Sequence, residues 1–401
     1  MTRGLAGGRR SLMALSRLSA LILLAALAGL AACLPKTPVT KPPLSAWKVK
    51  VTIQEGISRY LDSIGFCDKE EVFTVSCQVD GEKVILSGEA SEPAHKTAML
   101  EIVSSLLPEI KIIDNITVLP GPSLGDDCWG VLRVPVADLG DGPNSSGGDH
   151  TVTQARMGDR LRLLKENLGW YLCQMDDNYL GWIAPSDVWV TDKDPAEAFF
   201  LGHVALVTAQ MTAAYRSPNG DLALEENLVQ GTVLPIVAVE GQWANLSLPG
   251  GLKVWVKAGD VFGFDSYNKV FSEAKGAEGI LETAKQYVGL PYLWGGCTSQ
   301  GFDCSGFTQF CMKMNGYFIR RDAHMQHEQG EEVAKDDLSP GDLVFFSDNG
   351  RTASHVGIYM GDSLYIHSAG TGLAINSFDS SHPDYIKSRN DTYLGARRII
   401  K

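Results

Sequence analysis

Residues 291–307 read P-Y-L-W-G-G-C-T-S-Q-G-F-D-C-S-G-F and run directly into an apolar periodicity. Apolar side chains then recur at helical spacing at Phe307, Phe310, Cys311 and Met314. This pattern predicts a helix that begins close to Cys304. A thiol at a helix N-terminus lies among unpaired backbone N–H groups and the positive end of the helix dipole, and both favour thiolate over thiol. We therefore interpret Cys304 as a nucleophile and Cys311, one helical face further on, as an inert core thiol.

Two histidines follow on predicted strands. His355 opens the alternating stretch H-V-G-I-Y-M-G, and His367 follows in L-Y-I-H-S-A after a turn at Gly361 and Asp362. A tight hairpin brings the ends of two strands side by side, so His367 can orient and polarise the His355 ring. The arrangement predicts attack by Cys304 on a carbonyl carbon to give a thioester, with His355 as the general base.

Five sequence blocks in a fixed order carry a family resemblance. They are P-Y-x-W-G-G, D-C-S-G-F, R-D-A-x-x-Q at 321–326, L-S-P-G-D-L-V-F-F at 338–346, and H-V-G-I-Y. Together they resemble the NlpC-type family of bacterial cell-wall cysteine peptidases. The resemblance implies a papain-like α+β catalytic domain, which we place at 272–401, and hydrolysis of peptide bonds in peptidoglycan stems. It also implies that the Tyr292 phenol faces the oxyanion, alongside the Cys304 backbone N–H.

Upstream, one unit occurs twice at a constant offset of 73 positions. The recurring pairs include Gly158 with Gly231, Trp170 with Trp243, Trp182 with Trp255, and Asp187 with Asp260. A constant offset through short alternating strands and turn residues predicts duplicated small β-barrels, at 122–193 and 198–264. The first copy, with V-T-Q-A and N-Y-L-G-W-I, resembles the bacterial SH3-like domain. Such domains occur in tandem ahead of NlpC-type catalytic domains in the γ-D-glutamyl-L-diamino acid endopeptidase subgroup.

Residues 47–121 form a further predicted unit. A helical stretch leads into V-I-L-S-G at 84–88, a second helix follows from about residue 93 to 107, and I-K-I-I-D-N-I-T-V closes the unit at 110–118. This order resembles the BON domain, a small α/β module of periplasmic and envelope proteins. We interpret it as a packing or spacer module.

The first 33 residues are interpreted as a processing segment. Arginines precede an apolar run at 18–32 that is shorter than the about twenty residues of a confident membrane span. L-A-A-C at 30–33 resembles the bacterial lipobox, in which Cys33 would carry the lipid; the alternative is an ordinary signal peptide with an incidental cysteine. Leu34 resembles the outer-membrane sorting pattern, which implies a lipid-anchored envelope protein facing the periplasm. Residues 34–46 are a Pro-rich linker.

The composition limits the partners and cofactors. A formal net charge of −12 and a pI near 5.2 argue against nucleic acid, which needs a basic footprint. His324 and His327 are spaced as two metal ligands could be, but no acidic partner stands at ligand spacing and no C-x-x-C occurs, so no metal or cofactor is predicted. Cys67 and Cys77 flank a short segment that would allow a local disulfide.

The subgroup resemblance also implies a substrate pocket. Asp303 and Ser305 would line a site for the free N-terminus of an L-Ala-γ-D-Glu stem, and the Tyr179 hydroxyl of the first barrel would close it. Relatives carry an acid just ahead of V-T-Q, whereas this chain has His150 there and Asp149 one position away. Without amine recognition, the same domain could act as an endopeptidase on intact, glycan-linked stems. Amidase or acyltransferase chemistry and a non-catalytic envelope-binding lipoprotein are the remaining alternatives.

Overall fold

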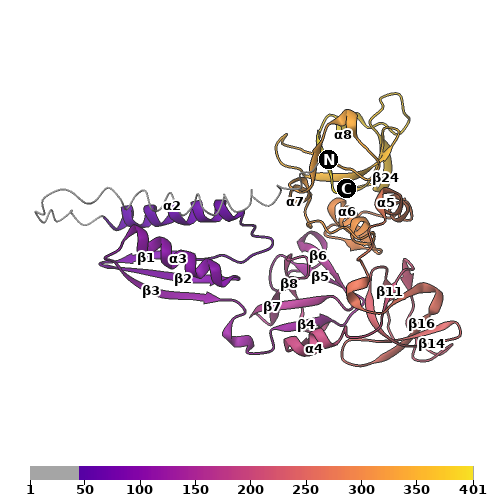
Figure 1. Ribbon diagram of the computed structural model, residues 1–401, viewed down its shortest axis with the longest axis horizontal. Helices are drawn as coiled ribbons and strands as arrows, with labels where there is room; N and C mark the ends of the chain where they lie inside the picture. Colours follow the sequence, from indigo (N-terminus) through magenta and orange to yellow (C-terminus); the bar gives the residue numbers. More distant parts are fainter. Residues whose placement is uncertain (1–44, 401) are drawn as a thin grey trace, which may run out of the picture. The chain divides into compact units, whose positions relative to one another are not determined.

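The computed structural model describes residues 45–400 (Figure 1). The predicted signal segment, Cys33 and nearly all of the Pro-rich linker lie outside the described residues. Among residues 45–400, no helix combines the length and the apolarity that crossing a bilayer requires.

The first unit after the linker is a three-stranded sheet with a crossover helix. Its elements are α2 (Ala46–Ile64), β1 (Ser76–Asp80), β2 (Lys83–Ala90), α3 (Pro93–Leu106) and β3 (Lys111–Val118). β1 is antiparallel to β2, and β2 is parallel to β3, so α3 makes the crossover that a parallel pair requires. Val84 and Leu86 on β2 and Met99 and Val103 on α3 are buried. These side chains form the contact between helix and sheet.

The first barrel is a seven-stranded sheet in the order β10-β4-β7-β8-β9-β5-β6. Its strands are β4 (Trp129–Leu132), β5 (Val136–Gly140), β6 (Thr151–Arg156), β7 (Arg160–Asn167), β8 (Trp170–Met175), β9 (Leu180–Ile183) and β10 (Val188–Thr191). The short helix α4 (Lys193–Ala198) follows.

The second barrel repeats this topology. Its strands are β11 (Val204–Val207), β12 (Met211–Thr212), β13 (Leu228–Val229), β14 (Val233–Glu240), β15 (Trp243–Ser247), β16 (Lys253–Lys257) and β17 (Val261–Phe264). The order β17-β11-β14-β15-β16 matches β10-β4-β7-β8-β9 of the first barrel. Gly158 and Gly231, equivalent positions in the two copies, share a φ of 90°, which a side chain would disfavour. The repeat in the sequence is therefore also a repeat in the structure.

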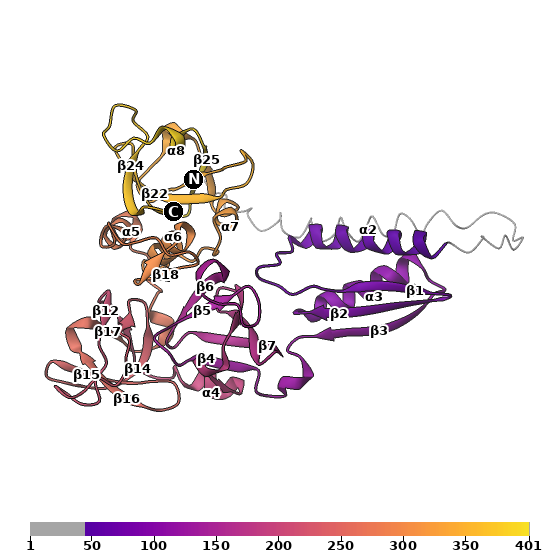
Figure 2. The ribbon, with the colours of Figure 1, turned by 180° about the vertical axis from the view of Figure 1, so that it is seen from behind.

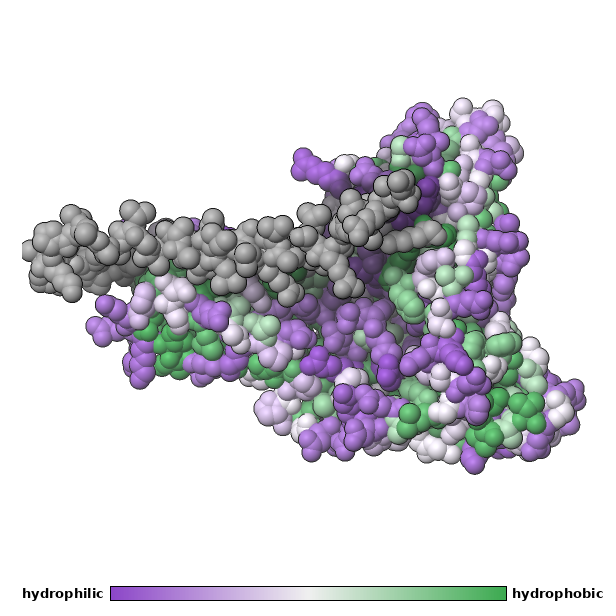
Figure 3. Space-filling model, viewed as in Figure 1, coloured by the Kyte–Doolittle hydropathy of each residue, from purple (hydrophilic) through white to green (hydrophobic). Residues whose placement is uncertain are grey.

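Several large apolar side chains are exposed on the second barrel, among them Val237 and Val239 on β14 and Phe262 on β17. Figure 3 shows hydrophobic residues gathered over this part of the chain, in green at the lower right.

The C-terminal domain is an antiparallel sheet with helices packed on it, as Figure 2 shows from behind. The six-stranded sheet has the order β20-β25-β21-β22-β23-β24. Its strands are β20 (Glu331–Val333), β21 (Leu343–Phe346), β22 (His355–Gly361), β23 (Leu364–Ala369), β24 (Gly372–Ser377) and β25 (Tyr393–Arg398). The helices are α5 (Gly276–Lys285), α6 (Cys304–Lys313), α7 (Ala323–His327) and α8 (Lys387–Asn390), and a hairpin of β18 (Cys297–Thr298) and β19 (Gly301–Phe302) precedes α6.

Helix α6 is central to this domain. Phe307, Phe310 and Cys311 are almost fully buried in one core with Val356 and Ile366 of the sheet. The apolar periodicity of the sequence therefore corresponds to the helix face that packs against β22 and β23. This packing fixes the N-terminus of α6 beside the first residue of β22.

The local disulfide that the sequence would allow between Cys67 and Cys77 is not formed, because both residues have free thiols. Cys77 lies on β1 with its side chain buried, whereas Cys67 lies half-buried in the loop after α2. Cys77 is thus used as a small core residue.

Candidate active site

The sequence places Cys304 at the first position of α6, as predicted. Asp303 is extended, with φ −82° and ψ −179°, and its Oδ1 accepts the Gly306 backbone N–H at 2.6 Å. This side-chain cap starts the helix at the cysteine. Cys304 is only 9% exposed, and the backbone N–H groups of Val356 and Ser305 face its thiol and lower its pKa.

The protonation state of Cys304 differs from the sequence-based expectation. Burial raises the pKa of the thiol to about 12, and the negative charge of Asp303 adds to this, while the two backbone N–H groups and Arg321 oppose it. The helix N-terminus therefore does favour the thiolate, but desolvation outweighs it. The resting group is therefore a thiol, and an attack by this sulfur would require a base that takes its proton.

The two predicted histidines are joined, and a third residue extends the chain. His355 Nε2 lies 2.6 Å from His367 Nδ1, and His367 Nε2 lies 2.7 Å from Asn376 Oδ1. The Asn376 amide is oriented by its Nδ2, which donates to the Asp384 carbonyl at 2.8 Å. Asn376 Oδ1 is an acceptor, so His367 carries its proton on Nε2 and accepts at Nδ1.

This order of donors fixes the tautomer of His355. Because His367 Nδ1 accepts, His355 must donate from Nε2, and its Nδ1 keeps a free lone pair. Burial, followed by the charges of His367 and Arg389, holds the pKa of His355 well below 6.5. Burial likewise lowers the pKa of His367 to about 4. Both rings are neutral at pH 7, and His355 Nδ1 is available as a base.

Tyr292 lies near the thiol. It pairs with Phe302 in an isolated β-bridge just before α6, and its side chain is half-buried. Burial raises the pKa of its phenol, and the charges of Cys304 and Asp303 act in the same direction. The hydroxyl is therefore protonated at neutral pH and can donate a hydrogen bond.

Asp303 and Ser305 are both bound to a buried arginine. The Arg321 side chain is 1% exposed, its Nη2 lies 2.6 Å from Asp303 Oδ2, and its Nη1 donates to Asp303 Oδ1 at 3.1 Å and Ser305 Oγ at 3.0 Å. Arg321 Nε donates to Thr153 Oγ1 of the first barrel at 3.0 Å. Asp303 and Arg321 thus form a buried ion pair, so the carboxylate charge of Asp303 is already neutralised.

Tyr179 reaches a different carboxylate. Its hydroxyl lies 3.0 Å from both oxygens of Asp322, the residue before α7, whose side chain makes no cap to that helix. Tyr179 is 3% exposed, and burial followed by the Asp322 charge raises the pKa of its phenol. Asp149 and His150 lie in an exposed turn, where His150 Nδ1 is 3.2 Å from Asp141.

Sequence reasoning missed Asn376 and Asp322. Asp322 is the acid of the R-D-A-x-x-Q block. This block contributed to the family resemblance, but its acid had no predicted role. Asn376 lies in A-I-N-S on β24, where Tyr365 is its direct partner and His367 its diagonal neighbour on the same face. A polar residue in an otherwise apolar strand next to the strand of His367 could have indicated Asn376 as its hydrogen-bond partner.

A buried cysteine at the start of a helix, beside a hydrogen-bonded pair of histidines on an antiparallel sheet, defines a cysteine peptidase of the papain-like class. Comparison with known proteins supports this class. Residues 289–391 match the NlpC/P60 family, 144–188 match the bacterial dipeptidyl-peptidase SH3 domain, and 75–120 match the BON-like domain.

Two relatives carry the same name, gamma-D-glutamyl-L-lysine dipeptidyl-peptidase. The one from Bacillus cereus is 30% identical over 260 residues, which cover 62% of this chain and 75% of the relative. The one from Bacillus subtilis is 39% identical over 188 residues, covering 46% of this chain and 60% of the relative. The crystal structure of an NlpC/P60 family protein from Bacillus cereus ATCC 10987 superposes with a TM-score of 0.60 at 26% identity, covering 68% of this chain and all of that one. The chain belongs to the NlpC/P60 family.

Proposed function

We propose that this protein is a peptidoglycan hydrolase that cleaves the bond between γ-D-Glu and the diamino acid of stem peptides. The names of the two Bacillus relatives support the bond, and the tandem barrels ahead of the catalytic domain support the subgroup. The observation that carries the proposal is the hydrogen-bonded chain of His355, His367 and Asn376, because it leaves one basic nitrogen available for the proton of Cys304.

The reaction follows from this chain. His355 Nδ1 takes the thiol proton as Cys304 Sγ attacks the scissile carbonyl carbon, and the positive charge on His355 is supported by His367 Nδ1. The oxyanion would accept hydrogen bonds from the Cys304 backbone N–H and the Tyr292 hydroxyl. His355 then gives its proton to the leaving amine, a thioester remains, and water activated by the same nitrogen hydrolyses it.

We propose that the free N-terminal amine of the stem is bound by Asp322 and Tyr179. A buried ammonium needs a carboxylate partner, and the charge of Asp303 is already neutralised by Arg321. Asp322 is half-buried, forms no ion pair within residues 45–400, and is held by the Tyr179 hydroxyl. In this reading, Asp303 and Ser305 shape the pocket through Arg321, while Asp322 supplies the charge.

Digests of three substrates test both parts of the proposal. Free tetrapeptide, N-acetylated tetrapeptide and whole sacculi would be incubated with the wild type and with Asp322→Asn, and the fragments identified by mass spectrometry. We expect cleavage between γ-D-Glu and the diamino acid, a preference for the free peptide, and loss of that preference in Asp322→Asn. Asp336→Asn, an exposed carboxylate in the same domain, serves as the matched control.

Each alternative gives a distinct result. Equal cleavage of the free and acetylated peptides by the wild type rejects amine recognition and leaves an endopeptidase that acts on intact stems. Fragments cut at another bond reject the bond assignment, and an acyl adduct indicates transferase chemistry. Absence of turnover with retained wall binding indicates a non-catalytic envelope protein.

We also propose that the protein is lipid-anchored in the cell envelope, facing the periplasm. The lipobox-like L-A-A-C at 30–33, with Leu34 after it, supports attachment through Cys33 and outer-membrane sorting. The proposed units are the signal at 1–33, the linker at 34–46, and domains at 47–121, 122–193, 198–264 and 272–401.

A further inference from the structure

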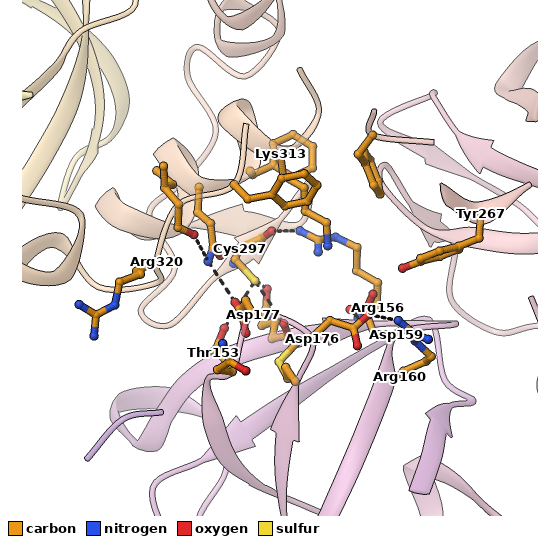
Figure 4. Close-up of a pocket in the computed structure, with 18 of the residues that line it drawn as sticks. Thr153, Arg156, Asp159, Arg160, Asp176, Asp177, Tyr267, Cys297, Lys313 and Arg320 are labelled. Carbon is orange, nitrogen blue, oxygen red and sulfur yellow. Dashed lines mark hydrogen bonds and ion pairs between the residues drawn. The ribbon is translucent and has the colours of Figure 1, made fainter. Parts of the chain in front are cut away.

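A cavity of about 830 Å³, called here the second cavity to distinguish it from the proposed substrate site, lies between the first barrel and the catalytic domain (Figure 4). Neither Cys304 nor His355 lines it. Its barrel wall includes Arg156, Arg160 and Asp176, and its catalytic wall includes Phe310 and Lys313 of α6. Ligand pockets of proteins have volumes of roughly 300 to 1,000 Å³ and often occur at domain interfaces. The cavity therefore has the size and position of a ligand site.

Two guanidinium groups in this cavity have unused hydrogen-bond donors. Arg156 is 6% exposed; its Nη2 donates to the Cys297 carbonyl, and its Nε is buried without a partner. Arg160 Nη2 lies 3.2 Å from Asp176 Oδ2, and its Nε is also buried without a partner. Among residues 45–400, the Nε–H of each guanidinium is therefore buried without an acceptor. Buried donors of this kind are normally satisfied, which points to a missing acceptor.

The arginines are held in place by aromatic rings. The Arg156 guanidinium carbon lies 5.5 Å from the centre of the Phe310 ring, and that of Arg160 lies 5.5 Å from the centre of the Tyr267 ring. The Lys313 ammonium lies 5.3 Å from the centre of the Phe271 ring and forms no ion pair among residues 45–400. The cations thus stand over an aromatic wall, so an organic ligand could pack on the rings while its acid groups meet the charges.

The cavity also contains acids. Asp159 Oδ2 accepts the Arg156 backbone N–H at 2.7 Å, and Asp176 pairs with Arg160. In total, four basic and three acidic side chains line the cavity; the remaining ones are Arg320 and Asp177. Arg320 is paired with Glu70 and Glu328 outside the cavity. A simple inorganic anion would bind the arginines but would use neither the acids nor the aromatic wall.

We propose that this cavity is a second binding site, for a small amino acid or peptide that carries one amine and two carboxylates, one carboxylate for each arginine. The carboxylates would bind Arg156 and Arg160, and the amine would bind Asp176. Phe310 and Lys313 belong to α6, the helix that begins at Cys304, so the ligand would contact this helix without contacting the thiol. The dipeptide L-Ala-γ-D-Glu has this charge pattern, and its choice as a probe rests on the proposed function, of which it would be a product.

Isothermal titration calorimetry on the full chain tests the site by measuring the dissociation constant of each probe. The protein would carry Cys304→Ala to prevent turnover, and the probes would be L-Ala-γ-D-Glu, D-Ala-D-Ala and inorganic phosphate. We expect L-Ala-γ-D-Glu to bind more tightly than the other two, and Arg160→Gln to weaken it tenfold or more, as loss of a charged hydrogen bond does. Asp176→Asn should weaken it as well, and it replaces Arg160→Gln if that variant does not fold.

The matched control is Arg162→Gln. Arg162 lies two residues further along β7, its side chain is 28% exposed against 29% for Arg160, and it pairs with Glu92 away from the cavity. Arg162→Gln should leave the affinity unchanged. A dipeptide affinity that Arg160→Gln and Asp176→Asn do not alter would place the ligand in the catalytic cleft and overturn the proposal. Phosphate binding as tight as that of the dipeptide would also overturn it. Cleavage of stem peptides by the wild type is measured in a separate assay. A negative binding result at the second cavity would therefore leave the proposed function intact.

Discussion

Replacing Asn376 with Leu should reduce turnover without removing any reacting group. Asn376 Oδ1 is the acceptor that keeps the His367 proton on Nε2, and through it keeps the free lone pair of His355 on Nδ1. Without that acceptor, His367 can place its proton on Nδ1. His355 must then accept at Nε2 and carry its own proton on Nδ1, where it cannot take the proton of Cys304.

The size of the effect follows from the buried donor. In Asn376→Leu, the productive tautomer leaves His367 Nε2–H unsatisfied, which costs about 1–3 kcal/mol. At 1.4 kcal/mol for a factor of ten, the productive tautomer falls by roughly 5- to 150-fold. We expect kcat/KM to fall by that factor mainly through kcat, because the Asn376 side chain bonds to His367 and the Asp384 carbonyl and has no bond to Asp322 or Tyr179 within residues 45–400. The Asp384 carbonyl also loses its donor, so the free energy of unfolding should fall by about 1–3 kcal/mol.

Initial rates on the free tetrapeptide, together with urea unfolding, measure both quantities. Asn390→Leu is the matched control, since Asn390 Nδ2 donates to the Ser377 carbonyl at 3.0 Å at the end of the same strand but lies outside the histidine chain. It should lose similar stability and keep its activity. Asn376→Asp keeps an acceptor for His367 and should retain more activity than Asn376→Leu. A folded Asn376→Leu protein with kcat/KM within twofold of the wild type would refute the tautomer argument.

Three further predictions concern the thiols and the histidine pair. Cys304→Ala should abolish hydrolysis while Cys311→Ala, whose fully buried thiol faces the core, keeps it; cleavage by Cys304→Ala would show that another group attacks. The pKa of His367 is about 4 in the folded protein and about 6.5 in the unfolded chain. As the pH falls below 6.5, the unfolded chain therefore takes up this proton before the folded protein does. The free energy of unfolding should consequently fall by about 3 kcal/mol between pH 6.5 and pH 4. Urea unfolding at a series of pH values should show this loss reduced in His367→Gln, and equal slopes in both proteins would contradict it. Lipid labelling of intact cells should be lost in Cys33→Ala, and a soluble, unlipidated wild type would contradict the anchor.

The sequence predicted those features of the site that depend on neighbours along the chain. Asp303, Cys304 and the apolar positions after them define a capped helix by local rules alone, and the hairpin between His355 and His367 follows from a turn and alternation. The protonation state of Cys304 could not be predicted in this way. It depends on burial beneath β22, a strand about fifty residues away, and that burial outweighs the helix terminus. The pairing of Asp303 with Arg321 is also tertiary, and it moves the available carboxylate to Asp322.

One strand of the first barrel connects the two proposed sites. From β6, Thr153 accepts the Arg321 hydrogen bond that supports the cleft, and Arg156 donates to the carbonyl of Cys297 in the hairpin before α6. Arg156 also lines the second cavity, so a substitution there would disturb the packing of the catalytic domain as well as ligand binding. In the described part of the chain, the Arg160 side chain hydrogen-bonds only to Asp176 of its own barrel. A loss of dipeptide affinity in Arg160→Gln with unchanged cleavage would therefore separate the cavity from the cleft, which no substitution of Arg156 can do.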